Sequence, residues 1–147
     1  MEQGDIRLRN ATYQRFVELG RAPAVSEVAK AADSSEEAVE LGWRRLHDAH
    51  ALVLDQETGE LLMANPFSGR ETQYRVYADD RSWFANCAWD AFGIGAALGV
   101  DSTIETVCPD CSHPIRLTVT DGVPDDETSI FHVLVRAARW WDDIIHT

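Results

Sequence analysis

Apolar residues recur at helical spacing through the first third of the chain and predict three helices. The first covers residues 6–19 and ends at Gly20. A short second helix covers residues 26–32. The third begins after a polar run in which Ser34 and Glu37 have the spacing of a capping box. We expect these helices to pack through their apolar stripes.

A β-hairpin is predicted directly after the third helix. Residues 51–54 and 60–64 are apolar, and they flank Gln56-Glu57-Thr58-Gly59, which has the composition of a turn. Three short helices followed by a hairpin are typical of a winged helix-turn-helix. We therefore expect a winged-helix-like lobe over residues 1–64.

The second half of the chain follows a break at Asn65-Pro66-Phe67-Ser68-Gly69. Small and apolar residues over 81–98 predict a buried helix that ends at Gly99. The remaining elements are strands around Tyr74 and Val76, at Ser102–Val107, at residues 115–120 and at residues 129–135, a turn at Asp121-Gly122 and a helix over residues 137–145. The pattern predicts an α+β protein whose first lobe packs on a small mixed sheet-and-helix lobe over residues 65–147.

Composition and charge restrict the function of the first lobe. The 147 residues are 45% apolar and 26% charged, as in a globular protein of one domain or two small lobes sharing a core. The net charge is −12, which is unfavourable for binding a polyanion. The helix that would enter a DNA groove carries Arg44 and Arg45, but also acidic residues. Nucleic acid is therefore an unlikely partner, and a winged-helix transcriptional regulator is only an alternative interpretation.

The sequence also predicts a cytoplasmic protein without a membrane segment. No apolar run approaches the roughly 18 residues that a membrane-spanning helix needs. The first five residues are acidic and do not resemble a signal peptide. In a reducing compartment, three cysteines favour free thiols or a metal site over a disulfide.

The first candidate site is Cys87-Ala88-Trp89-Asp90. At positions i and i+3 of a helix, Cys87 and Asp90 share one face and can reach a common ligand. Close to a helix N-terminus, the dipole favours the thiolate, which is the nucleophilic and metal-binding form. The alternative is a buried structural cysteine beside a carboxylate that accepts backbone hydrogen bonds.

The second candidate site is Cys108-Pro109-Asp110-Cys111, in a turn between two predicted strands. Such a turn can direct both sulfurs at one metal, and only Cys87, His113 or Asp110 could complete the site. One hypothesis is therefore a metal-binding module in which Cys87, Cys108 and Cys111 hold zinc, copper or mercury in a trigonal or four-coordinate site. An idle reduced pair is the alternative, and Pro109 and Pro114 argue against a redox motif at a helix start.

The segment Trp83-Phe84-Ala85-Asn86-Cys87-Ala88-Trp89-Asp90-Ala91-Phe92-Gly93-Ile94 resembles the organomercurial (alkylmercury) lyase family. Residues 66–76 resemble the stretch that precedes the family's catalytic helix, and the resemblance is sharp over about residues 65–120. It implies a lyase-type fold in which the winged-helix lobe is structural. It also implies that Cys87 is a mercury thiolate and that Asp90 donates a proton to carbon. One of Cys108 and Cys111 then corresponds to a supporting cysteine.

This chain departs from the family pattern at the second catalytic cysteine. In the family this cysteine follows the last predicted helix, about where this chain stops at His146-Thr147. Either the chain is a short member, or the Cys108–Cys111 pair supplies the second thiolate.

The expected reaction is protonolysis of a carbon–mercury bond to a hydrocarbon and Hg(II). The expected ligand is a small organomercurial or a soft metal ion, and no cofactor is expected beyond external thiols. The alternative from another class is a non-catalytic soft-metal-binding module using the three cysteines.

Overall fold

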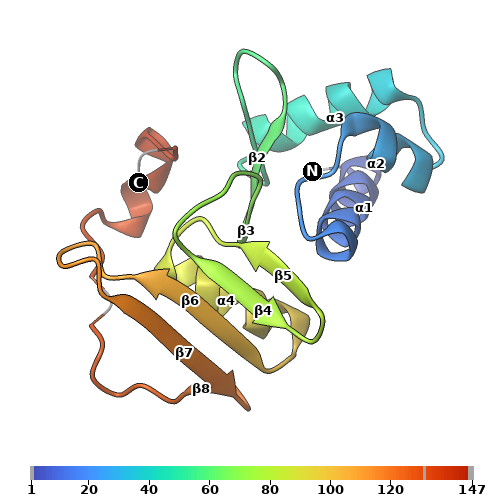
Figure 1. Cartoon of the computed structure of the whole chain (residues 1–147). Helices are drawn as coiled ribbons and strands as arrows, with labels where there is room; N and C mark the ends of the chain where they lie inside the picture. Colours follow the sequence, from blue (N-terminus) through green and yellow to red (C-terminus); the bar gives the residue numbers. More distant parts are fainter. Residues whose placement is uncertain (1, 131, 146–147) are drawn as a thin grey trace.

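Three helices and a hairpin open the chain in the predicted order. The computed structural model describes residues 2–130 and 132–145 (Figure 1). Its helices are α1 (Gln3–Leu19), α2 (Val25–Ala31), α3 (Glu36–Asp48) and α4 (Ala88–Leu98), followed by the 3-10 helix η1 (Ala137–Asp142). Among the described residues, no helix is long and apolar enough to cross a membrane.

The helix ends follow from a few polar and glycine positions. Gly20 takes the left-handed conformation after α1, and its N–H donates to the carbonyl of Phe16. At the start of α3 the capping side chain is Ser35, which accepts a hydrogen bond from the N–H of Ala38 at 3.2 Å. The prediction that Ser34 caps this helix is therefore wrong by one residue.

A small antiparallel sheet follows α3. Its strands, in spatial order, are β1 (Val53–Leu54), β2 (Leu61–Ala64) and β3 (Phe67–Ser68). Because β3 pairs with β2 through Met63–Ser68 and Ala64–Phe67, this sheet continues past the predicted lobe boundary at residue 64. Both the boundary and the winged-helix assignment stay predictions.

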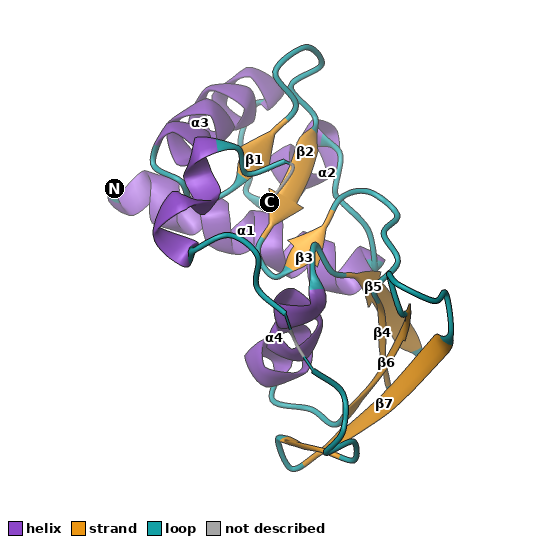
Figure 2. Ribbon diagram, turned by 90° about the vertical axis from the view of Figure 1, so that its left-hand side faces the viewer, coloured by secondary structure: helices purple, strands orange, loops and turns teal. Residues whose placement is uncertain are grey.

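A five-stranded antiparallel sheet forms the second half. Its spatial order is β5 (Arg81–Phe84), β4 (Arg75–Ala78), β6 (Ser102–Val107), β7 (Pro114–Thr120) and β8 (Val123–Pro124). Helix α4 lies against one face and contacts β4 and β6 (Figure 2). The α+β fold class is confirmed.

Three expected elements differ from the structure. The helix expected over residues 137–145 is the 3-10 helix η1, which ends at Asp142. Residues 81–84 form strand β5 rather than the first turn of a helix, because Val76 of β4 pairs with Trp83. Residues 129–130 and 132–135 form no strand, and their side chains are exposed. Apolar runs this short do not distinguish a strand, a helix and an irregular apolar segment by pattern alone.

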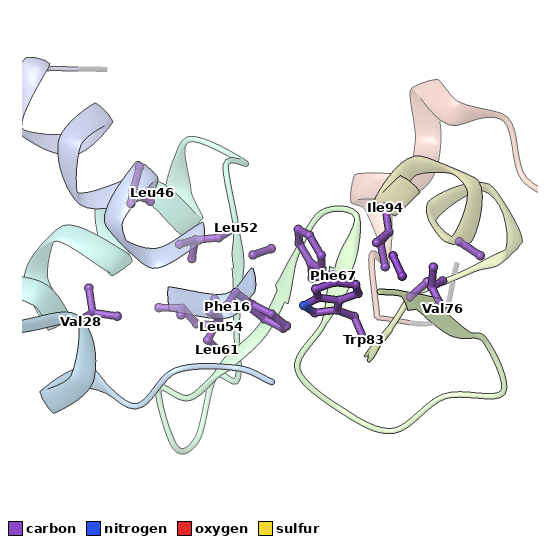
Figure 3. Close-up of a cluster of buried hydrophobic side chains, with 14 of the residues drawn as sticks. Phe16, Val28, Leu46, Leu52, Leu54, Leu61, Phe67, Val76, Trp83 and Ile94 are labelled. Carbon is purple, nitrogen blue, oxygen red and sulfur yellow. The ribbon is translucent and has the colours of Figure 1, made fainter. Parts of the chain in front are cut away.

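One apolar core joins the two halves of the molecule. Phe67 lies at its centre, with its ring centroid 5.3 Å from that of Phe16 and 6.2 Å from that of Trp83. Figure 3 shows these rings between a cluster around Val28 and Leu46 and the side chains of the second half. The lobes are therefore not independent apolar units.

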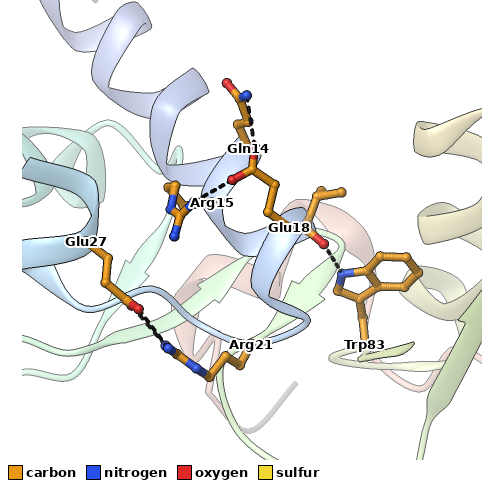
Figure 4. A network of polar contacts seen from close by, with 7 residues as sticks. Gln14, Arg15, Glu18, Arg21, Glu27 and Trp83 are labelled. Carbon is orange, nitrogen blue, oxygen red and sulfur yellow. Dashed lines mark hydrogen bonds and ion pairs between the residues drawn. The ribbon is translucent and has the colours of Figure 1, made fainter. Parts of the chain in front are cut away.

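Polar contacts reinforce the same junction (Figure 4). The indole N–H of Trp83 donates to the carbonyl of Val17 near the end of α1, at 3.1 Å. Nearby, the guanidinium of Arg21 forms a bidentate pair with Glu27, with distances of 2.7 and 2.9 Å. Strand β5 is thus fixed to α1, and the loop after α1 is fixed to α2.

Substitution of Gly69 by alanine should destabilise the small sheet. A Cβ at this position would lie 2.2 Å from the carbonyl oxygen of Leu61 and 3.0 Å from that of Leu62. Backbone atoms cannot swing away like a side chain, so we expect the free energy of unfolding to fall by about 1–3 kcal/mol. Urea denaturation measures this change.

Gly4→Ala is the matched control, because a Cβ on Gly4 meets nothing within 4 Å. It should change the free energy of unfolding by about 0.5 kcal/mol or less. Equal losses in the two variants would contradict the steric explanation.

Candidate functional site

Cys87 occupies the N-cap of α4, where the chain leaves the sheet and turns into the helix. The preceding Ala85 is buried and bridges to Phe67, which fixes the backbone on the strand side. On the helix side, the carbonyl of Cys87 accepts the N–H of Ala91 at 3.0 Å. The thiol therefore lies on a backbone that is held from both sides.

Cys87 and Asp90 are in contact, as their spacing predicts. The thiol donates to Oδ2 of Asp90 with a sulfur–oxygen distance of 3.7 Å. Burial raises the pKa of the Cys87 thiol, while the N–H groups of Asp90 and Trp89 oppose this shift. The helix terminus therefore lowers this pKa as predicted, but desolvation is the larger effect, and the expected net preference for the thiolate is wrong.

The Asp90 carboxyl favours its protonated form more than an ordinary aspartate does. Burial raises its pKa, and hydrogen bonds from Asn86 and Cys87 oppose the shift. A carboxyl that favours its protonated form can donate a proton to a ligand bound at the neighbouring thiol.

Asn86 anchors the pair to the rest of the protein. Its Nδ2 lies 3.2 Å from Oδ2 of Asp90 and 3.1 Å from Oδ1 of Asn65. The same nitrogen lies 3.4 Å from the carbonyl oxygens of Pro66 and Phe67. These four oxygens fix the orientation of the amide. If the amide were flipped, its own oxygen would lie against the surrounding oxygens in place of the nitrogen.

The N-terminal helix reaches this network through Tyr13. Its hydroxyl donates to the carbonyl of Asn65 at 3.0 Å. Burial raises the pKa of Tyr13; Arg9 opposes this shift and Asp90 adds to it. Sequence reasoning missed Tyr13, Asn65 and Asn86, because they meet only after the halves have folded together.

Cys87 and Asp90 open onto a cavity of about 450 Å³. Asn65, Asn86 and Asp90 give its lining polar groups close to the thiol, and the C-terminal segment contributes mostly apolar residues. The lining residues are Met63, Asn65, Tyr74, Asn86, Cys87, Ala88, Asp90, His132, Val133, Leu134, Val135, Trp140, Ile144 and Ile145.

The C-terminal segment crosses from one half of the molecule to the other. Figure 2 shows it running past α4 toward the three-helix region. The ring of Trp141 stacks on that of His50, just after α3, with centroids 4.0 Å apart. The carbonyl of Val135 accepts the indole N–H of Trp140 at 2.8 Å, which folds the segment back on itself. It therefore forms a wall of the cavity while touching the N-terminal half.

Cys108 and Cys111 lie in the turn between β6 and β7 and do not line this cavity. All three cysteines are free thiols. Within residues 2–130 and 132–145, no group of three or more Cys, His, Asp or Glu side chains is placed to hold a metal ion. The structure therefore does not assemble the expected site of Cys87, Cys108 and Cys111.

Comparisons with known proteins identify the family and support the fold. The family model for alkylmercury lyases, MerB, matches residues 67–147. Among solved structures, the mercury-bound form of MerB2 is similar, with a TM-score of 0.64 and 21% sequence identity. The similarity covers 86% of this chain and 60% of that chain. At this identity it supports the fold. The curated protein sequences give no match.

Proposed function

Because the chain belongs to the alkylmercury lyase family, we propose that it cleaves carbon–mercury bonds in the cavity beside Cys87 and Asp90. The observation that carries the proposal is the thiol–carboxyl contact of 3.7 Å in the lining of that cavity. A soft thiolate suits mercury, and an adjacent carboxyl can supply the proton that the leaving carbon needs.

In the first step the sulfur of Cys87 binds the mercury of the organomercurial. The thiol proton passes to Oδ2 of Asp90, and the substrate's original ligand leaves with its electron pair. The contact within the pair gives this proton a direct route. Because both groups are held by fixed partners, the transfer needs little rearrangement.

In the second step the protonated Asp90 gives its proton to carbon. The carbon–mercury bond breaks, its electron pair goes to carbon, and the hydrocarbon leaves. An external thiolate completes the coordination of Hg(II), and a second one displaces Cys87 as a thiolate. Cys87 then takes a proton from solvent, which restores the free enzyme. The cavity lining contains no second thiol among the described residues, which is why the proposal assigns this ligand to an external thiol.

The cavity suits a small organic group. Its lining combines apolar side chains, among them Val133, Val135 and Ile144, with the polar groups around Cys87. An organomercurial has the same division, with a soft cationic end and an apolar end. Burying the apolar group orients the carbon–mercury bond toward Asp90, and each buried CH₂ contributes about 0.8 kcal/mol.

The test is release of hydrocarbon and Hg(II) from phenylmercury by the purified protein in the presence of a small thiol. The thiol alone gives the background rate. Release above that background that disappears in Cys87→Ser supports the proposal. Mercury binding with no release would support the non-catalytic soft-metal-binding alternative.

Replacing Asn86 by leucine should slow lysis and change its pH dependence. Hydrogen bonds to charged groups contribute about 1.5–3 kcal/mol, so we expect kcat to fall about 10- to 100-fold. Asn86 lowers the pKa of Asp90, and its removal raises that pKa further. In the active form, the Cys87 thiol carries a proton and the Asp90 carboxylate carries none. When the carboxylate is also protonated, it can no longer accept the thiol proton. The acidic limb of the pH–rate profile should therefore move to higher pH.

Asn10→Leu, at an exposed position of α1, is the control and should keep the wild-type profile. A slower Asn86→Leu variant with an unmoved acidic limb would show that Asn86 acts on the fold and not on the proton of Asp90.

A further inference from the structure

The cysteines of the β6–β7 turn have no part in the proposed reaction, yet the turn holds them in a defined arrangement. Val107 pairs with Pro114 at the end of the ladder, so residues 108–113 form the whole connection. Inside it, the N–H of Ser112 donates to the carbonyl of Cys108 at 2.8 Å, and the N–H of Cys108 donates to the carbonyl of His113 at 2.9 Å. These bonds fix the backbone that carries both thiols.

We propose that Cys108 and Cys111 form a second soft-cation site, separate from Cys87, that binds Hg(II) or Cu(I) through two thiolates. Cys111 is exposed and Cys108 is half-buried, so an ion can reach the pair from solvent. The two cysteines are three residues apart in one turn, so a single ion can bridge them.

The groups around Cys108 face its sulfur. The sulfur accepts hydrogen bonds from the N–H groups of Cys111 and Asp110, and the Cys111 side chain also interacts with it. The two thiols therefore lie beside one another in the turn.

The ligand count selects the kind of ion. Structural zinc sites use four protein ligands. No third Cys, His, Asp or Glu within the described residues is placed to join Cys108 and Cys111 on a metal ion. A pair of thiolates is sufficient for ions that accept linear two-coordination, such as Hg(II) and Cu(I). Binding Hg(II) forms two sulfur–mercury bonds and releases up to two protons to solvent, with no change of oxidation state.

The test uses the full chain with Cys87→Ser, which leaves the turn as the only pair of thiols. Anaerobic titration with Hg(II) against a fixed concentration of a small monothiol should load one ion per chain and consume two free thiols. The additional substitution Cys108→Ser should weaken binding by on the order of 100-fold or more, because the second sulfur no longer binds intramolecularly.

Three results would overturn the proposal. The Cys87→Ser chain could bind Hg(II) no more tightly than the monothiol competitor, or the additional Cys108→Ser change could leave affinity unaltered. Stoichiometric Zn(II) that resists a chelator would also contradict a two-coordinate site. The titration does not depend on lysis activity, so its result tests the second site separately from the proposed reaction.

Discussion

The Asp90→Asn variant should bind an organomercurial but fail to cleave it. Asparagine keeps the shape of the side chain but has no acidic proton, so the carbanion has no donor at the position of Oδ2. Positioned general acids contribute roughly 100- to 10,000-fold, and we expect a loss of kcat in that range. Single-turnover release of benzene from phenylmercury, with bound mercury measured in parallel, separates binding from chemistry.

Two further variants make this result specific. Asp80→Asn changes an exposed carboxylate outside the cavity lining and should leave kcat unchanged. Cys87→Ser should lose cleavage together with tight binding at the cavity, since it removes the proposed mercury ligand. If Asp90→Asn retained turnover within a few-fold of wild type, the proton would have to come from another group or from water.

The largest effect on stability is expected for Phe67→Ala. Phe67 is 2% exposed and lies between Phe16 and Trp83, so its ring joins the two halves of the core. Truncating a buried phenylalanine costs about 3–5 kcal/mol, through lost burial and the cavity left behind. We expect a loss of this size in urea denaturation followed by tryptophan fluorescence.

The matched control is Phe92→Ala on α4, where the side chain is 36% exposed. This substitution should lower the free energy of unfolding by about 1 kcal/mol or less. A Phe67→Ala loss as small as that of Phe92→Ala would mean that the halves are held together mainly by other contacts. Two separate unfolding transitions would also contradict a shared core, because they would show that each half unfolds independently.

The sequence predicts those parts of this fold whose signals are local. Helix α1 ends at Gly20 as expected, and β6 has the expected bounds at Ser102–Val107. Strand β5 was missed because Trp83 and Phe84 continue directly into the apolar run of α4. Its pairing with β4 is a tertiary contact, which the local pattern does not contain.

The candidate site divides in the same way. Cys87 and Asp90 are three residues apart, so their contact follows from one turn of helix. Asn65 reaches Asn86 across 21 residues, and Tyr13 reaches Asn65 across 52. Neither contact has a periodic signal, because each depends on the packing of α1 and β3 against the second half.

The cavity beside Cys87 draws its walls from residues 63–65, 86–90 and 132–145 and from Tyr74. Unfolding separates these segments along the chain, so only the folded state can offer a ligand the complete surface. Any molecule held there consequently shifts the folding equilibrium by mass action. At one hundred times its dissociation constant, a ligand adds about 2.7 kcal/mol to the free energy of unfolding. Substrate supply and protein lifetime are thereby coupled, since the chain resists unfolding and degradation best while its ligand is abundant.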